Sequence, residues 1–186
     1  MQRYELFLYP QDIYFFIKID FQYRKAGKMK RKMKKVSDSM IEQVYQVRPE
    51  HLNGAGRLFG GKLMEWIDEI AGLVAIRHTQ TNVVTASVDN LRFIRGAYQN
   101  DLLVLIGKVS YVGNTSMEIR VDTYVEDLTG MRRPINRAYL TLVAIDENGE
   151  PVQIPGIILE NEGEEAEWEA AKRRKELRIQ RKKEGF

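Results

Sequence analysis

Cysteine is absent from the 186 residues of the chain, so disulfides, thiolate nucleophiles and cysteine-ligated zinc are excluded. Histidine is scarce, because the chain has only two, His51 and His78, far apart in sequence. A metal site would therefore consist mostly of carboxylates, and no group of Asp and Glu has the spacing of a ligand motif. We predict that the protein holds no metal.

The chain also lacks a long uninterrupted apolar run. Its most apolar early stretch, YELFLYPQDIYFFIKIDF, is broken by Pro10, Asp12, Lys18 and Asp20, too soon to span a bilayer. The same interruptions make it a poor signal peptide, which needs a continuous apolar core before a small-residue cleavage site. We therefore expect a cytoplasmic protein.

Positive charge is concentrated near the N-terminus. The net charge is +3, and much of the basic excess lies in RKAGKMKRKMKK, residues 24–35. Such a run can contact nucleic acid or an anionic membrane, but a solvated arm is the more common explanation. Because residues 1–36 differ in composition from the rest, we predict an N-terminal extension, disordered or an artefact of upstream translation, with natural initiation at Met29, Met33 or Met40.

The next part of the chain predicts one strand and one long helix. IEQVYQV, residues 41–47, alternates as a strand does, and residues 49–61 form a glycine-containing loop. A helix is expected from about Gly60 to Arg77, with a wide apolar stripe that indicates a largely buried element. The stripe consists of Leu63, Trp66, Ile67, Ile70, Leu73 and Val74. At the end of this helix we assign a structural role to His78.

Strands and a second helix make up the remainder. Strands are expected at residues 83–94, 102–113, 116–127 and 135–146. In the first of them, Thr85, Ser87 and Asp89 alternate with apolar residues and are expected to share a face. One helix followed by meandering strands predicts an α+β fold, an antiparallel sheet packed on a helix. Residues 161–186 are acidic first and basic last, which predicts a charged C-terminal helix at a surface or interface.

The stretch HLNGAGRLFGGKLMEWIDE contains the parts of a site that attacks a carbonyl. Gly61 and Asp68 are about two turns apart, so they lie on nearly the same helix face, together with Ala71 and Ala75. Backbone N–H groups at the start of the helix can stabilise an oxyanion, and Asn53 offers an amide. The alternative interpretation is that Asn53 belongs to turn chemistry and that Asp68 faces solvent.

Several segments resemble, in order and spacing, the hotdog-fold acyl-coenzyme A (CoA) thioesterases, in particular bacterial short- and medium-chain acyl-CoA hydrolases and the cytosolic brain-type hydrolase. They are HLNGAGRLFGGKLMEWIDEIAG, the RH that follows, VVTASVDNLRF and YVGNTSMEIRV. The resemblance covers residues 41–146 and the C-terminal helix. It implies a central helix wrapped by an antiparallel sheet in residues 37–160, acyl-CoA as substrate, no cofactor, and a homo-oligomer, at least a dimer and further a trimer of dimers.

The resemblance also implies roles for individual residues. Asp68 matches the family's helix aspartate, a general base or nucleophile, and Asn53 its loop asparagine, which polarises the thioester carbonyl with a backbone N–H of Gly60 or Gly61. The two side chains would meet across a dimer interface. The implied CoA contacts are Thr85, Ser87, Gly113, Asn114, Thr115 and Ser116, with Arg95, Lys108, Arg132 and Arg133 as candidate phosphate partners. His51 stands where many relatives have aspartate, so we favour a loop role over a base.

Two other functions stay open. Some hotdog proteins are acyl-CoA-sensing transcriptional regulators, but residues 1–36 lack the helix-turn-helix that precedes the domain in those proteins. A DNA-binding assay across salt concentrations separates the two functions, because phosphate contacts weaken steeply with salt. Hotdog dehydratases usually place a histidine with the catalytic carboxylate, and neither His51 nor His78 shares the helix face of Asp68. We predict an acyl-CoA thioester hydrolase that binds neither nucleic acid nor membrane.

Overall fold

The computed structural model describes residues 31–185. In chain order its elements are β1 (Met33–Lys35), β2 (Ile41–Gln46), the 3-10 helix η1 (Pro49–His51), α2 (Gly60–Thr79), β3 (Asn82–Phe93), β4 (Leu102–Val112), β5 (Ser116–Glu126), β6 (Arg132–Ile145), β7 (Gly156–Ile158) and α3 (Glu162–Glu184). Every strand and helix predicted from the sequence is present, and its bounds differ from the prediction by a few residues at most. The short elements β1, η1 and β7 were not predicted.

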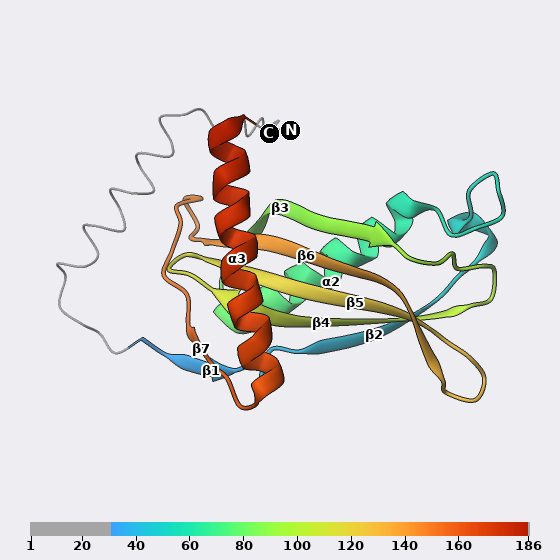
Figure 1. Cartoon of the computed structure of the whole chain (residues 1–186), viewed down its shortest axis with the longest axis horizontal. Coiled ribbons are helices and arrows are strands. Elements are labelled where there is room, and N and C mark those ends of the chain that lie inside the picture. Colours follow the sequence, from blue (N-terminus) through green and yellow to red (C-terminus); the bar gives the residue numbers. More distant parts are fainter. Residues whose placement is uncertain (1–30, 186) are drawn as a thin grey trace. The chain divides into compact units, whose positions relative to one another are not determined.

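The main sheet is antiparallel, and its strands lie in the order β2-β4-β5-β6-β3. Helix α2 packs against one face of the sheet, and α3 crosses the opposite face (Figure 1). This confirms the predicted α+β fold with a central helix on an antiparallel sheet. Strand β3 is an edge, and within residues 31–185 no strand pairs with its outer side. Its outer backbone N–H and C=O groups are therefore open to pairing.

Helix α2 fills the core because one side of it is apolar along its whole length. Its buried residues are Leu63, Trp66, Ile67, Ile70, Ala71, Val74, Ala75, His78 and Thr79. Gly107 on β4 allows this helix to approach the sheet closely, since a Cβ there would lie 2.6 Å from Cγ2 of Ile70 and 2.9 Å from Cγ2 of Val74. The helix ends at Gln80, which adopts the left-handed conformation with φ of 62°.

The exposed face of α2 departs from the prediction in two respects. Asp68 is exposed, but Ala71 and Ala75, which we expected on the same face, are both fully buried. Leu73, which we predicted in the buried stripe, is exposed further along the helix, as is Ile76. The exposed stripe therefore shifts round the helix toward its C-terminus, because a twisted sheet wraps around a straight helix. The helical spacing of residues in the sequence does not predict that twist.

Helix α3 covers charged side chains of β5 on the sheet face opposite α2. Glu118 and Asp122 are buried there, with 2% and 6% of their surface exposed. Arg120 bridges Asp122 and Glu167 of α3 at 2.7 and 2.6 Å, and Arg174 of α3 bridges Glu118 and Glu167 at 2.8 and 2.7 Å. Buried charges need such partners. The C-terminal helix is thus attached by ion pairs together with a small apolar contact formed by Trp168 and the buried Ala171.

The position of Glu167 between two arginines changes its pKa. Burial alone would raise the pKa of Glu167, but the charges of Arg120 and Arg174 outweigh burial and hold that pKa below its usual value. Burial alone would lower the pKa of Arg174, but the hydrogen bonds to Glu118 outweigh burial and raise that pKa above its usual value. The Arg174 guanidinium also lies 3.7 Å from the ring centroid of Tyr139.

The residues just before β2 belong to the same packed unit as the sheet. Strand β1 pairs with β7 in parallel, and Val36 is part of the core with 4% of its surface exposed. The Ser39 hydroxyl lies 3.0 Å from Nδ1 of His78, and Nε2 of His78 lies 3.3 Å from the carbonyl oxygen of Pro155. His78 therefore joins three segments, which is a structural role, although the sequence predicted only a favourable position at the end of the helix. Residues 1–30, with most of the predicted extension and basic run, lie outside the described residues.

Candidate active site

Asp68 and Thr85 form the best-defined polar pair on the exposed side of α2. The Thr85 hydroxyl on β3 donates to Oδ1 of Asp68 at 2.7 Å. Oδ2 of Asp68 has no hydrogen-bond donor within residues 31–185. The hydroxyl therefore fixes one carboxylate oxygen and leaves the other available to a ligand or a water molecule. Hydrogen bonds to an ionised group are among the stronger ones in proteins.

This carboxylate lies in a cavity of about 350 Å³ between α2 and β3. The lining residues are Gly61, Met64, Glu65, Ile67, Asp68, Thr85, Val88, Leu91 and Leu140. Most of these side chains are apolar, and the two carboxylates lie on the α2 side. A charged group on an apolar wall with few competing polar partners is a common arrangement in binding and catalytic sites.

Asn53 lies in the loop before α2, in a turn that orients its amide. Its Oδ1 accepts hydrogen bonds from the backbone N–H groups of Ala55 and Arg57 at 2.9 and 3.2 Å. The Asn53 N–H donates to the Arg57 carbonyl at 2.7 Å, and Gly56 closes the turn with φ of 69°. Because Oδ1 is held by two donors, Nδ2 is the free end of the amide. The turn role of Asn53 is therefore present in the structure, and its binding role stays a prediction.

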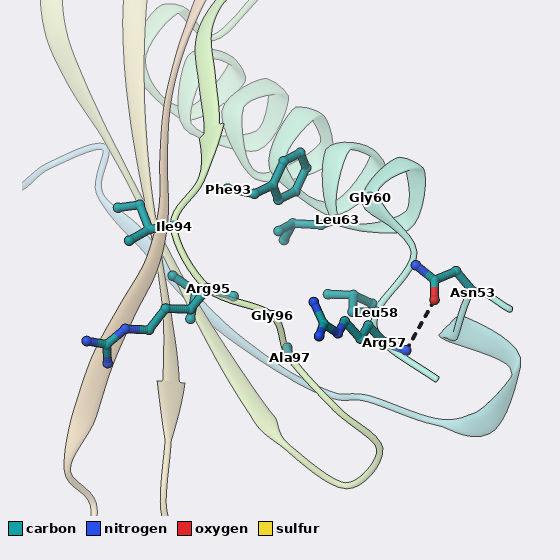
Figure 2. Close-up of a pocket in the computed structure, with 11 residues that line it drawn as sticks. Asn53, Arg57, Leu58, Gly60, Leu63, Phe93, Ile94, Arg95, Gly96 and Ala97 are labelled. Atoms are coloured by element: carbon teal, nitrogen blue, oxygen red, sulfur yellow. Dashed lines mark hydrogen bonds between the residues drawn. The ribbon is translucent and has the colours of Figure 1, made fainter. Parts of the chain in front are cut away.

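A second cavity, of about 440 Å³, adjoins Asn53 (Figure 2). Its lining residues are Asn53, Arg57, Leu58, Gly60, Leu63, Phe93, Ile94, Arg95, Gly96, Ala97 and Ile135. Figure 2 shows the Asn53 oxygen turned to Arg57 and the nitrogen turned toward the chain that enters α2 at Gly60. The donor end of the amide and the start of the helix are therefore on the same side.

The first turn of α2 supplies backbone donors. The N–H groups of Lys62 and Leu63 both donate to the Phe59 carbonyl, at 3.0 and 3.2 Å. The N–H groups of Gly60 and Gly61 have no acceptor in the described part of the chain, as expected for the start of a helix. Gly61 also leaves room for the Phe59 ring, since a Cβ at position 61 would lie 2.5 Å from it. Free N–H groups at a helix start favour a negatively charged group.

Within one chain Asn53 and Asp68 do not meet. They line different cavities, and no hydrogen bond joins them. Gly60 lines the cavity of Asn53, whereas Gly61 lines the cavity of Asp68. The predicted combination of the two side chains therefore needs a second copy of the chain, and the across-interface arrangement stays a prediction.

Ser87 does not share a face with Thr85, and this corrects the sequence expectation. The register of β3 against β6 shifts between Thr85 and Ser87, which marks a β-bulge. Thr85 points to Asp68, whereas the Ser87 hydroxyl donates to Asp89 at 3.3 Å. Asp89 is in turn paired with arginines of α3 on the other sheet face. A bulge inserts one residue and reverses the alternation that the prediction assumed.

The predicted CoA turn, residues 113–116, lies away from both cavities. Gly113 donates to the Ser116 carbonyl at 2.7 Å, and the side chain of Gln153 donates to Asn114 Oδ1 at 3.3 Å. The Thr115 carbonyl accepts from the backbone of β6 at 2.9 Å. None of the four residues lines either cavity. A CoA contact at this turn stays a prediction that would need the substrate to extend across the surface.

The candidate phosphate partners differ in whether a carboxylate of the chain already pairs with them. Arg132 is held by Glu42 and Glu126 at 2.6 and 2.7 Å, and these contacts raise its pKa above the usual value. Arg95, by contrast, lines the cavity of Asn53. Arg57 lines it too, and the sequence analysis missed it. Its position four residues after Asn53 was the available signal, because a tight turn brings such residues together.

His51 serves the loop rather than the cavity of Asp68. Its Nδ1 accepts from the backbone N–H of Arg48 at 3.1 Å, and its ring meets the ring of Trp66 edge-on at 5.0 Å between centroids.

In residues 31–185 no helix is long and apolar enough to cross a membrane. The same residues contain no group of three or more histidine, aspartate and glutamate side chains that would hold a metal ion.

Comparison with known proteins identifies related sequences. The thioesterase superfamily model matches residues 55–131. The uncharacterised acyl-CoA thioester hydrolase YkhA of Bacillus subtilis is 41% identical over 128 residues, which cover 68% of this chain and 74% of YkhA. The cytosolic acyl-CoA thioester hydrolase of Rattus norvegicus is 33% identical over 81% of this chain. The chain spans only 40% of that relative's length.

Solved structures agree with the sequence matches. A hexameric acyl-CoA thioesterase in its apo form superimposes with a TM-score of 0.78 and 40% identity, over 81% of this chain and 97% of that one. The acyl-CoA hydrolase of Staphylococcus aureus, solved with butyryl-CoA and CoA, gives a TM-score of 0.78 and 37% identity, over 82% and 93%. This chain therefore belongs to the hotdog-fold acyl-CoA thioesterases of the thioesterase superfamily.

Proposed function

We propose that the protein hydrolyses acyl-CoA thioesters to a free carboxylic acid and CoA. The observation that carries this proposal is Asp68, held by Thr85 at 2.7 Å in a largely apolar cavity with its second oxygen open. Relatives named acyl-CoA thioester hydrolases indicate the substrate class. A carboxylate with one fixed and one open oxygen suits a general base or a nucleophile.

The active site is completed by a second copy of the chain. Strand β3 offers an unpaired edge beside the cavity of Asp68, and its Val84 and Val88 are 42% and 43% exposed. Met64 on the neighbouring face of α2 is 43% exposed. Apolar surface next to an open strand edge suits a two-fold partner that extends the sheet. In this dimer Asp68 faces Asn53 of the partner subunit, and three dimers assemble further, as in hexameric neighbours.

Charge on the carbonyl oxygen is stabilised by donors of the Asn53 loop and the helix start. Nδ2 of Asn53 is the free end of its amide, and the N–H groups of Gly60 and Gly61 are unpaired in the described chain. Such donors act on charge that develops in the transition state and contribute more there than to substrate binding.

The reaction needs only water and these groups. As general base, Asp68 takes a proton from water, and the water oxygen forms a bond to the thioester carbonyl carbon. The carbon–sulfur bond then breaks, and the proton passes from Asp68 to the sulfur of the departing CoA. As nucleophile, Asp68 would itself bond to the carbonyl carbon while the carbon–sulfur bond breaks and CoA leaves as a thiolate. Water would then hydrolyse the anhydride to the free acid and Asp68, and the remaining proton would pass to the CoA sulfur. Neither course requires a cofactor, and we propose that both products leave into the cytoplasm.

Variants of a solved neighbour support this set of residues. The Staphylococcus aureus hydrolase was solved with an asparagine, an aspartate and a threonine each replaced by alanine. These three residues occur in the same order and at the same sequence separations as Asn53, Asp68 and Thr85 of this chain. The first two are the catalytic residues proposed here, and Thr85 is a positioning residue.

The test is thiol release from a series of acyl-CoA substrates. Asp68→Ala and Asn53→Ala should each lower kcat by about a hundredfold or more while the oligomer stays intact. Coexpression of the two variants tests the shared site. A mixed dimer has one site with both wild-type residues, so random pairing restores about a quarter of the wild-type activity. Near wild-type turnover by Asp68→Ala would refute the mechanism, and no recovery on mixing would place both residues in one subunit.

A further inference from the structure

Arg57 lies beside Asn53 without a carboxylate partner. The Asn53 N–H donates to the Arg57 carbonyl and the Arg57 N–H donates to Oδ1 of Asn53, so the Arg57 side chain starts from a fixed position next to the proposed oxyanion donor. Its guanidinium carbon lies 6.0 Å from the ring centroid of Tyr98. No carboxylate lies within ion-pair distance of it in residues 31–185. The cavity that it lines contains a second arginine, Arg95, and no acidic residue.

This lack of a partner distinguishes Arg57 from six arginines of the described residues that pair closely with carboxylates. Those arginines have a carboxylate oxygen at 3.1 Å or less, and they are Arg120, Arg132, Arg137, Arg174, Arg178 and Arg181. Arg77 and Arg173 also have no carboxylate partner in residues 31–185, but neither of them lines the cavity of Asn53. The positive charge at the Asn53 cavity is left for something outside the chain.

The cavity also has room for an anion beside Arg57. Gly96 forms part of its wall, and a Cβ at position 96 would already lie 3.5 Å from Cδ of Arg57. Figure 2 shows the Arg57 side chain lying across the cavity next to Leu58 and Gly96, whereas the Arg95 side chain points away from Asn53. Of the two arginines that line this cavity, Arg57 is thus the one beside Asn53.

We propose that Arg57 binds an anionic group of the substrate and thereby determines which thioesters this enzyme prefers. The inference rests on the proposed thioesterase function. An acyl-CoA substrate offers two anions of suitable chemistry: a phosphate of CoA, or a carboxylate at the far end of a dicarboxylic acyl group. A guanidinium recognises either through charge-assisted hydrogen bonds. The walls of the cavity, formed by Leu58, Leu63 and Phe93, accommodate the apolar part of the substrate.

The test compares Arg57→Gln with a matched control, Arg173→Gln, on the exposed face of α3. Each variant is assayed on butyryl-CoA, glutaryl-CoA and the N-acetylcysteamine thioesters of both acids, which lack phosphates. If the anion is a CoA phosphate, Arg57→Gln raises KM about tenfold for both CoA thioesters only. If it is the acyl carboxylate, KM rises for both glutaryl thioesters only. Arg173→Gln changes none of the four.

Two results overturn the proposal. One is an unchanged KM for Arg57→Gln on all four substrates, and the other is an equal loss on butyryl-N-acetylcysteamine, which carries no anion. Calorimetry of CoA and of glutarate gives a readout that does not depend on turnover. Arg57→Gln should weaken binding of one of them about tenfold. The anion-binding role of Arg57 is rejected if variant and wild type bind both probes equally, or if the wild type binds neither probe. Both outcomes can be read even if none of the thioesters is hydrolysed and the proposed function fails.

Discussion

The hydroxyl of Thr85 donates to Oδ1 of Asp68 at 2.7 Å, across the gap between strand β3 and helix α2. This contact joins residues that lie 17 positions apart in sequence, and it defines the orientation of the proposed base. Thr85 reaches Asp68 because the strand places its side chain on the helix side of the sheet, just before the bulge that turns Ser87 to the other side.

Thr85→Val should therefore lower kcat while leaving KM within about twofold. Valine keeps the shape of threonine but removes the donor, so Asp68 loses a charge-assisted hydrogen bond of about 1.5–3 kcal/mol. This corresponds to a reduction in kcat of about ten- to a hundredfold. Thr85→Ser is the matched control, because it keeps the hydroxyl and should retain most of the activity. Steady-state thiol release with butyryl-CoA measures both variants, and equal kcat for valine and threonine would contradict the positioning role.

The bulge in β3 also illustrates which features of the fold can be predicted from local sequence patterns and which cannot. The central helix and the long strands were predictable, because apolar spacing in α2 and alternation in β4 to β6 follow directly from local geometry. The face of Ser87 was not, since a bulge depends on how β3 registers against β6. The pairing of β1 with β7 is likewise a contact between short segments far apart in sequence.

For the candidate site, the residue types were predictable and their partners were not. Asn53 and Asp68 followed from their place in a glycine-rich loop and on a helix face. The fixed orientation of the Asn53 amide and the Thr85 contact depend on distances that spacing does not give. The ion pairs of α3 are a similar case. The charge order of that helix was evident from the sequence, but its pairing with Glu118 and Arg120 of β5 depends on how the sheet folds.

The contribution of residues 33–39 to the fold is testable through stability. A chain that begins at Met40 lacks β1, the core residue Val36 and the Ser39 hydroxyl that contacts His78. Val36 alone contributes about 1.5–3 kcal/mol by burial. A chain that begins at Met33 keeps all of these and serves as the control. Thermal unfolding should give a Tm several degrees lower for the Met40 chain. Equal values of Tm would show that residues 33–39 add no stability and would contradict the contribution expected from Val36 and Ser39.

The attachment of α3 should weaken in acid because of Glu167. Arg120 and Arg174 hold the pKa of Glu167 below its ordinary value of 4.5. A carboxyl whose pKa is lower in the folded than in the unfolded chain stabilises the fold fully above the unfolded value. That contribution is lost as the pH falls from about 4.5 through the folded pKa. Glu167→Gln should therefore lower the free energy of unfolding at pH 7 by about 3 kcal/mol, since it leaves buried arginines with one partner fewer.

Urea unfolding at a series of pH values measures this effect through the fluorescence of Trp168, whose ring centroid lies 4.5 Å from that of Tyr111 under α3. The difference between wild type and Glu167→Gln should be largest near neutral pH and should shrink as the pH is lowered below 4.5. Glu169→Gln is the matched control. Glu169 pairs with Lys172 in solvent with 63% of its side chain exposed, so its loss should change stability by less than about 1 kcal/mol. A difference for Glu167→Gln that stays constant with pH would mean that α3 is held by packing alone.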